Sequence, residues 1–200
     1  GQCTAEGLGD WFYKSSTQAS SNYGIDKSGR VGMYVEEKNR SWCTSSNAND
    51  QRAITIECAS DTVEPYTMYE VVYAKLIDLC VDICKRNGKK KLLWFGDKDK
   101  SLNYEPKDEE MLITVHRWFA NKSCPGNWLY ARLGDLAAKV TAQLGGGSAE
   151  VIPSGMQARE FQNLTEAQVV AKVGALFTAD RKKSGILASV SMAQFILESG

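Results

Sequence analysis

RAITIECA, residues Arg52 to Ala59, is the stretch that decides the fold class. Its isoleucines and threonine are β-branched and most of its other residues are apolar, which predicts a strand. The next pattern along the chain has apolar residues at helical spacing over residues 67–86, and Asn87 and Gly88 end it. The strand and the long helix together predict a mixed α/β fold, with a mixed central β-sheet flanked by helices.

Shorter elements are expected on both sides of this pair. They are a helix over 4–13 with Thr4 as its N-cap, a hairpin of the runs 22–25 and 31–35, a short strand over 91–95, a loop over 96–110 and a helix over 127–144. Because the strands come early in the chain and most helical residues come later, we expect the helices to cover the sheet.

The overall composition is that of a globular protein without a strong electric field. The 200 residues are 43% hydrophobic and 24% charged, so the chain can bury a core without disulfide bonds. Lys plus Arg and Asp plus Glu number 24 each, and this balance predicts no nucleic-acid partner. No apolar run approaches the roughly 20 residues that span a bilayer, so no membrane insertion is expected.

The composition changes at Gly145. GGGSAEVIPSGMQ begins there and predicts a flexible Gly/Ser-rich linker over 145–160. Beyond it, LTEAQVVAKVGALF and ILASVSMAQFILESG have apolar residues at helical spacing and predict an all-α segment over 161–200. We therefore expect one domain over 1–144, a linker, and the first part of a second, helical domain.

The six cysteines are expected to be mostly free thiols, because their density is below that of small disulfide-rich domains. Cys80 and Cys84 stand four positions apart on the predicted long helix. This spacing suits thiols packed along an apolar helix face, and the alternative is one half of a metal site.

TVHRWFANKSCPG, residues 114–126, contains the single histidine, His116, and also Cys124. Zinc binds nitrogen and sulfur donors, and a catalytic zinc commonly takes three protein ligands and one water. A loop that folds back would bring both side chains to one ion. The spacing alone does not decide for a metal site. The alternative is that His116 is a core histidine with its hydrogen bonds satisfied and that Cys124 is an ordinary buried thiol.

HRWFANKSCPG resembles the segment with the second and third zinc ligands of the zinc-dependent N-acetylmuramoyl-L-alanine amidases, the family of phage endolysins, bacterial autolysins and peptidoglycan-recognition proteins. The succession of a hairpin, a loop with Trp42 and a strand ending in Glu57 is similar to the same family, and the likeness covers most of 1–144. It implies a zinc cofactor held by His116 and Cys124, with a first ligand histidine upstream of Gly1. On this basis the domain lacks its first strand, and we expect the intact parent to be active and this chain to be impaired.

The resemblance implies hydrolysis of the amide between N-acetylmuramic acid and the L-alanine of the peptidoglycan stem peptide. Glu57 matches the family's catalytic glutamate, the general base for the attacking water, and its alternative is a strand-edge glutamate in solvent. Lys122 lies where several members carry a donor near the metal and would stabilise the oxyanion. Its alternative is a solvated loop lysine.

Trp42 and Trp118 are the candidates for substrate binding, because an indole stacks on sugar rings or peptide, although large aromatic residues are more often in the core. Two positions depart from the family pattern. Many relatives have histidine where this chain has Cys43 and Asn22, and neither is normally an essential ligand. These departures therefore bear on substrate contacts and not on the reaction.

KSGILASVSMAQFILESG resembles the start of the lysozyme-like bacterial peptidoglycan endo-β-N-acetylglucosaminidases, whose general acid is the glutamate of an LESG motif. Glu198 holds that position, and a carboxylic acid with a raised pKa can protonate a glycosidic oxygen. The two resemblances imply a bifunctional hydrolase of bacterial peptidoglycan that acts on the cell wall, as a secreted autolysin or a phage endolysin. The competing class is a non-catalytic peptidoglycan-binding module or an inactive fragment. Cys124 favours the enzyme, because some binding relatives lose this ligand.

Overall fold

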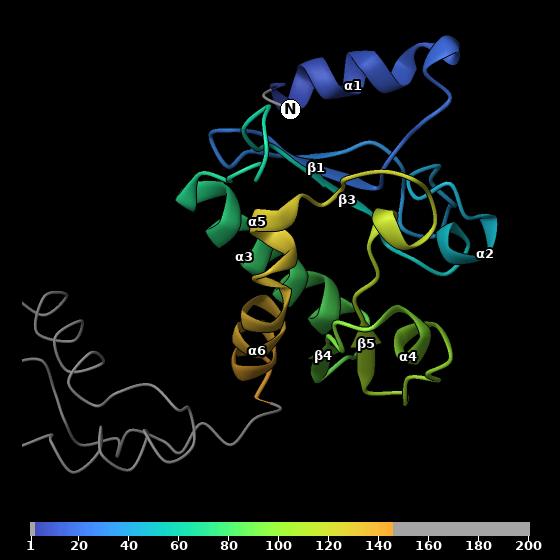
Figure 1. The fold of residues 1–200 in the computed structure, drawn as a ribbon, viewed down its shortest axis with the longest axis vertical. Helices are drawn as coiled ribbons and strands as arrows, with labels where there is room; N and C mark the ends of the chain where they lie inside the picture. The colour runs from blue at the N-terminus through green and yellow to red at the C-terminus, as the bar shows by residue number, and fades with distance from the viewer. Residues whose placement is uncertain (1–2, 146–200) are drawn as a thin grey trace, which may run out of the picture. The chain divides into compact units, whose positions relative to one another are not determined.

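The computed structural model describes residues 3–145. The predicted linker beyond Gly145 and the glucosaminidase segment with Glu198 lie outside the described residues. Within 3–145 the chain is a mixed α/β structure of short strands and helices, as the sequence predicts (Figure 1). None of the helices in this range has the length and hydropathy that a bilayer crossing requires.

The described residues contain α-helices, 3₁₀ turns and strands in an alternating order. In chain order they are α1 (Ala5–Tyr13), η1 (Ser15–Thr17), β1 (Tyr23–Ile25), β2 (Val31–Met33), α2 (Asn47–Asp50), β3 (Ile56–Cys58), α3 (Glu70–Arg86), β4 (Lys91–Leu93), α4 (Lys98–Leu102), β5 (Glu110–Leu112), η2 (His116–Trp118), α5 (Asn127–Tyr130) and α6 (Leu133–Gln143).

The strands form two separate sheets. β1 lies between β2 and β3, antiparallel to β2 and parallel to β3. β4 and β5 pair in parallel as a second, two-stranded sheet. The expectation of one central sheet is therefore wrong for the described residues. The expectation does not include β5, which directly follows a charged loop, and so it does not include the pairing of β4 with β5.

Local signals predict the ends of the early helices well. Thr4 Oγ1 accepts a hydrogen bond from the backbone N–H of Gly7 at 3.1 Å, so the predicted N-cap is confirmed. The long helix α3 begins slightly later than expected and ends at Arg86, and Gly88 follows at φ +66°. This left-handed conformation favours glycine, which is why Asn-Gly is a stop signal.

Two expectations about the later elements are wrong. The predicted loop over 96–110 contains α4, which begins after Asp97, whose Oδ1 accepts from Lys100 N at 2.7 Å. The predicted helix over 127–144 is two helices, because the chain leaves regular helical geometry at Arg132, with φ −107° and ψ −1°. The apolar pattern continues across this break, so spacing alone does not reveal it.

The three-stranded sheet is covered on both faces. Figure 1 shows α1 on one side of β1 and β3, and α3 on the other. β1 is buried along its whole length, and α3 buries Val72, Leu76 and Ile83 in the core. α6 packs against α3 and β4, so the second sheet shares the same core.

Asp26 ties the hairpin turn to the first helix. Its carboxylate is buried and accepts hydrogen bonds from Ser28 Oγ at 2.7 Å, Arg30 Nε at 2.9 Å and Ala5 N at 3.2 Å. Burial raises the pKa of Asp26, but the hydrogen bonds outweigh this effect and hold the pKa well below its usual value. The ionised carboxylate therefore stabilises the fold.

This arrangement predicts a loss of stability in acid. Because the pKa of Asp26 in the folded state lies below the unfolded value of about 3.9, its contribution is present at neutral pH and is lost as the pH falls below about 4. Asp26→Asn should have a lower free energy of unfolding at pH 7, and a smaller decline than the wild type between about pH 5 and pH 2.5. Urea unfolding at several pH values measures both, and parallel declines in the two proteins would contradict the assignment.

Candidate active site

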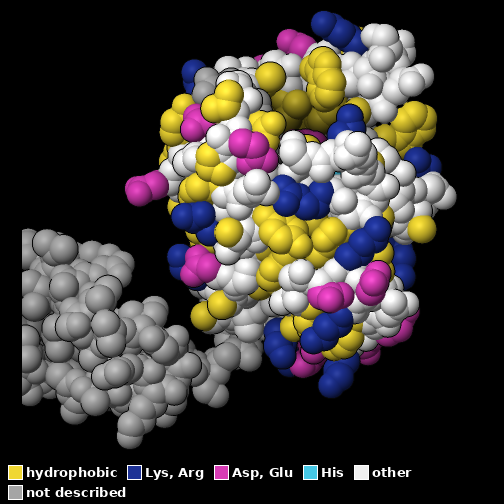
Figure 2. Space-filling model, in the orientation of Figure 1, with side chains coloured by type: hydrophobic (Ala, Val, Ile, Leu, Met, Phe, Trp, Pro, Cys, Tyr) yellow, Lys and Arg dark blue, Asp and Glu magenta, His cyan; other side chains and the backbone are white. Residues whose placement is uncertain are grey.

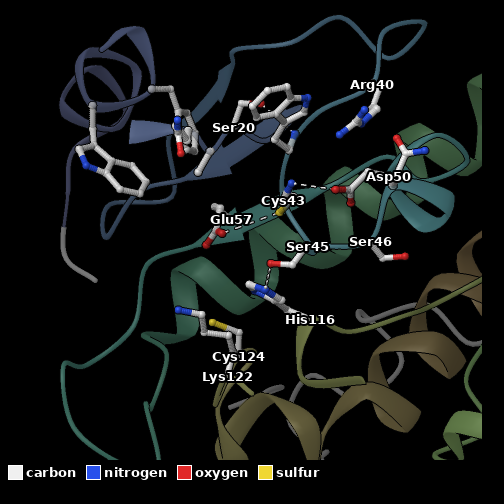
Figure 3. Close-up of a pocket in the computed structure, with 16 residues that line it drawn as sticks. Ser20, Arg40, Cys43, Ser45, Ser46, Asp50, Glu57, His116, Lys122 and Cys124 are labelled. Atoms are coloured by element: carbon white, nitrogen blue, oxygen red, sulfur yellow. Dashed lines mark hydrogen bonds between the residues drawn. The ribbon is translucent and has the colours of Figure 1, made fainter. Parts of the chain in front are cut away.

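One pocket brings together most of the predicted site. It has a volume of about 560 Å³ and is lined by residues of α1, α2, β3 and η2 and of the segments before β1, after β2 and after η2. Glu57, His116, Lys122 and Cys124 line it (Figure 3). Trp42 lines it as well. The fold therefore unites five of the six predicted site residues that lie in the described range.

His116 and Cys124 are brought together by a closed turn. The backbone N–H of Arg117 donates to Cys124 O at 3.1 Å, so the chain folds back between the two side chains as expected. Gly126 follows at φ +82°, and a Cβ there would lie 2.7 Å from Tyr66 Cβ. Because only glycine fits this position, Gly126 fixes the path of the chain behind Cys124.

The two candidate ligands are of the donor types that zinc prefers. Burial and the nearby charge of Lys122 lower the pKa of His116, which favours the neutral imidazole that binds metals. Burial raises the pKa of the Cys124 thiol, and the Glu57 carboxylate adds to this effect. A bound cation would oppose that shift by stabilising the thiolate. Within residues 3–145 no group of three or more His, Cys, Asp and Glu side chains is placed to hold a metal ion, so the pair is not a complete site by itself.

Glu57 projects from β3 into the pocket. The residue remains accessible to solvent, yet protein atoms of the pocket walls surround its carboxyl, and this burial raises its pKa. Cys43, one of the two departures from the family pattern, lines the pocket beside it, with its Sγ 3.8 Å from Glu57 Oε1. The position inside the pocket favours the general base over a glutamate on the outer surface.

α2 and the loop before it contribute residues whose roles the sequence does not reveal. Asp50 is buried, and its carboxylate accepts hydrogen bonds from Cys43 N at 3.2 Å, Thr44 N at 3.1 Å and Thr44 Oγ1 at 2.6 Å. These bonds hold the loop against the pocket. Ser45 adopts φ +61°, and its Oγ lies 3.2 Å from His116 Nε2. Nothing in the polar stretch CTSSNAND marks either residue.

One of the two predicted substrate-binding tryptophans faces the pocket. Trp42 is 55% exposed, and the guanidinium of Arg40 lies 5.3 Å from its ring centre. Trp118 is 7% exposed and stacks on Trp94, with ring centres 5.0 Å apart. Trp118 lies in the core and does not line the pocket, whereas His116 of the same turn η2 does, so the substrate-binding prediction for Trp118 is corrected to a core role.

Asn22, the second departure from the family pattern, has a structural role. Its side chain is fully buried and does not line the pocket. Nδ2 donates to the carbonyl oxygens of Val35, Glu36 and Asn39 at 3.2, 3.2 and 3.3 Å. Oδ1 accepts from Thr55 N at 2.9 Å and from Thr55 Oγ1 at 3.1 Å. Asn22 thus joins the start of β1 to the chain after β2 and to the segment before β3.

Comparison with known proteins identifies the family of the chain. A sequence model of the N-acetylmuramoyl-L-alanine amidase family matches residues 2–127, more than half of the chain. No curated protein and no solved structure matches. The matched range contains every residue of the pocket, from Trp11 to Cys124. The chain therefore belongs to the N-acetylmuramoyl-L-alanine amidase family, whose members act on peptidoglycan.

Proposed function

We propose that the pocket hydrolyses the amide between N-acetylmuramic acid and the L-alanine of the stem peptide in bacterial peptidoglycan, with zinc as the cofactor. The observation that carries this proposal is the convergence of Glu57, Lys122, His116 and Cys124 on one pocket. Hydrolysis of an amide needs an activated water, an electrophile for the carbonyl oxygen and a proton for the leaving amine. These four residues, with the zinc ion that His116 and Cys124 would hold, offer a candidate for each of the three requirements.

His116 and Cys124 would hold the zinc ion. A neutral imidazole nitrogen and a thiolate sulfur suit zinc, and both side chains line the same pocket. Because a catalytic zinc commonly takes three protein ligands, we expect the third from outside residues 3–145. When bound, zinc would lower the pKa of a water molecule to about 7 and polarise the scissile carbonyl.

Glu57 is the proposed general base. Its carboxylate takes a proton from the attacking water as the water oxygen bonds to the amide carbon. It then delivers that proton to the alanine nitrogen as the C–N bond breaks, so the carboxylate is restored. The raised pKa of Glu57 suits both steps, since a catalytic acid-base works best when its pKa is near the working pH.

Two further side chains have proposed roles around the scissile amide. Lys122 is exposed at the pocket wall, where its ammonium would donate to the oxyanion that forms on the carbonyl oxygen. Trp42 offers an exposed indole face to a sugar ring or to the peptide.

We propose further that the parent protein is a bifunctional cell-wall hydrolase. The support is the likeness of KSGILASVSMAQFILESG to the peptidoglycan glucosaminidases, with Glu198 as the general acid. An amidase that releases stem peptides and a glucosaminidase that cuts glycan strands would act on the same polymer. The protein would reach the wall as a secreted autolysin or as a phage endolysin.

Product analysis on purified peptidoglycan, with a form of the protein that includes the third zinc ligand, tests the proposed amidase. With zinc supplied, we expect stem peptides with a free N-terminal L-alanine and glycan strands with free lactyl carboxyl groups, identified by mass spectrometry. A glucosaminidase would instead produce new reducing ends. Sedimentation of the protein with the wall, without any released peptide, would overturn the amidase and favour the peptidoglycan-binding module.

The contact between Ser45 and His116 predicts that removal of the Ser45 hydroxyl changes the zinc affinity without changing the stability of the fold. A residue that orients a metal-binding histidine typically changes metal affinity by about 10–100-fold. Ser45→Gly removes the hydroxyl 3.2 Å from His116 Nε2, and glycine adopts the φ of +61° without strain. We expect zinc to bind about tenfold more weakly, with no loss of thermal stability.

Ser46→Ala is the matched control for this experiment. Ser46 also lines the pocket, but its hydroxyl caps α2 by accepting from Asn49 N at 3.3 Å. Loss of the cap should lower the free energy of unfolding by about 1 kcal/mol and leave zinc affinity unchanged. Competition with a chromophoric chelator measures the affinity. Equal affinities of the wild type and Ser45→Gly would rule out an orienting role for Ser45.

A further inference from the structure

Arg40 differs from the other arginines of residues 3–145. Each of the others forms a hydrogen bond or an ion pair with an oxygen atom of the protein: Arg30, Arg52, Arg86, Arg117 and Arg132. Arg40 has instead the contact of its guanidinium with the Trp42 ring, 5.3 Å from the ring centre. Within the described part of the chain it is therefore a cation without an anionic partner.

Arg40 reaches the pocket from the side opposite Lys122. Figure 3 shows the two cations on opposite sides of the pocket, with Cys43 and Ser45 between them. Glu57 lies nearer to the Lys122 side. A substrate whose scissile amide lies at Glu57 can therefore extend along the pocket to Arg40. Figure 2 shows basic and acidic side chains scattered among apolar and polar ones over one face of the molecule.

The acidic residues of the pocket leave the charge of Arg40 unneutralised. Asp50 uses its carboxylate for the N–H groups of Cys43 and Thr44 and for the Thr44 hydroxyl. Glu57 accepts from the Cys43 thiol. A guanidinium held against an indole face presents its N–H donors in one plane, and a carboxylate can accept two parallel hydrogen bonds from it.

The proposed substrate carries carboxylates on only one side of the scissile bond. The sugar and its lactyl arm are neutral, because the lactyl carboxyl is part of the amide. The stem peptide has carboxyl groups on its second residue, a glutamate, and at its C-terminus. We propose that Arg40, held against Trp42, binds a free carboxylate of the stem peptide. Arg40 then marks the peptide end of the pocket and selects muramyl peptides in which that carboxyl is not amidated. This inference rests on the proposed function.

Binding of three muramyl tripeptides tests the proposal. The probes are N-acetylmuramyl-L-alanyl-D-glutamyl-L-lysine with both carboxyl groups free, with the glutamyl carboxyl amidated, and with the C-terminal carboxyl amidated. Calorimetry on the whole chain carrying Glu57→Gln measures each Kd without cleavage. We expect one amidated form to bind about tenfold more weakly, since a charge-assisted hydrogen bond is lost. That form identifies the carboxyl group that Arg40 binds.

Arg40→Gln, added to the Glu57→Gln chain, should bind all three probes equally. Their common affinity should be that of the Glu57→Gln chain for its weakest-binding amidated probe. Arg40→Lys keeps the charge but loses the planar fork, so its preference should be intermediate. Lys38→Gln is the matched control, because Lys38 pairs with Glu36 and does not line the pocket. It should retain the wild-type preference. The proposal would be overturned if the Glu57→Gln chain bound all three probes equally. It would also be overturned if Arg40→Gln lowered the affinity for all three probes by the same factor.

The amidase itself is tested separately, with Glu57 intact. A chain that cleaves the free and the amidated probes with equal kcat/KM overturns the role of Arg40 and leaves the amidase standing. A form of the protein that includes the third zinc ligand and cleaves none of the probes, with zinc supplied, overturns the proposed function on which the role depends.

Discussion

Replacement of Glu57 by glutamine should lower kcat for the muramyl–L-alanine amide by about 10²–10⁴-fold. Glutamine has nearly the same shape, but its amide does not take up a proton, so both proton transfers assigned to Glu57 are lost. KM should change little, because the side chain still starts from the same position on β3. Steady-state kinetics on a soluble muramyl tripeptide measures both constants.

Glu105→Gln is the matched control for the Glu57 variant. The Glu105 side chain is 88% exposed, is 3.9 Å from Arg52, and does not line the pocket. Its kcat should equal that of the wild type. The zinc content of Glu57→Gln should also be unchanged, since Glu57 is not a proposed ligand. A kcat within about tenfold of the wild type in Glu57→Gln would mean that Glu57 is not the general base.

The largest effect on stability is expected at Asn22. Asn22→Ala should lower the free energy of unfolding by about 3–5 kcal/mol. Its side chain makes five hydrogen bonds in a fully buried position. The variant removes the acceptor of the Thr55 N–H and a donor to the carbonyl oxygens of Val35 and Asn39, while the Glu36 carbonyl still accepts from Asn39 N at 2.9 Å. Each buried group left unsatisfied costs about 1–3 kcal/mol, partly relieved by relaxation. Urea unfolding followed by circular dichroism measures the loss.

Asn39→Ala provides the comparison for Asn22→Ala. The Asn39 side chain is exposed and donates one bond of 3.4 Å, to Glu36 Oε2. Its removal should change the free energy of unfolding by no more than about 0.5 kcal/mol, while its backbone carbonyl still accepts from Asn22. If the two variants lose equal stability, the buried hydrogen bonds of Asn22 do not secure this part of the sheet.

The sequence predicts those elements whose signals are local. Thr4 caps α1 and Gly88 follows the end of α3 because a side-chain acceptor and a left-handed residue act within one helical turn. The division into two sheets and the break near Arg132 depend on contacts between distant segments. No periodicity within either segment encodes them, which is why they differ from the expectation.

The candidate site also combines residues that the sequence predicts with residues that only the folded chain reveals. His116 and Cys124 are predictable because the chain has one histidine and the family resemblance covers both residues. Ser45 and Arg40 are not predictable, since a serine at positive φ and an arginine without an anionic partner are recognised only in the folded chain. Trp118 illustrates the opposite error, because the sequence does not show to which side of η2 it points.

The central claim is that His116, Cys124 and Glu57 form one zinc-dependent catalytic centre. Zinc content and release of N-terminal alanine from peptidoglycan test it most directly, measured on the same samples of a form of the protein that includes the third zinc ligand and of its variants His116→Ala, Cys124→Ser and Glu57→Gln. We predict zinc and cleavage in the form without a substitution, loss of both in the first two variants, and zinc without cleavage in the third. Cleavage that persists in Cys124→Ser or in zinc-free protein would contradict the claim.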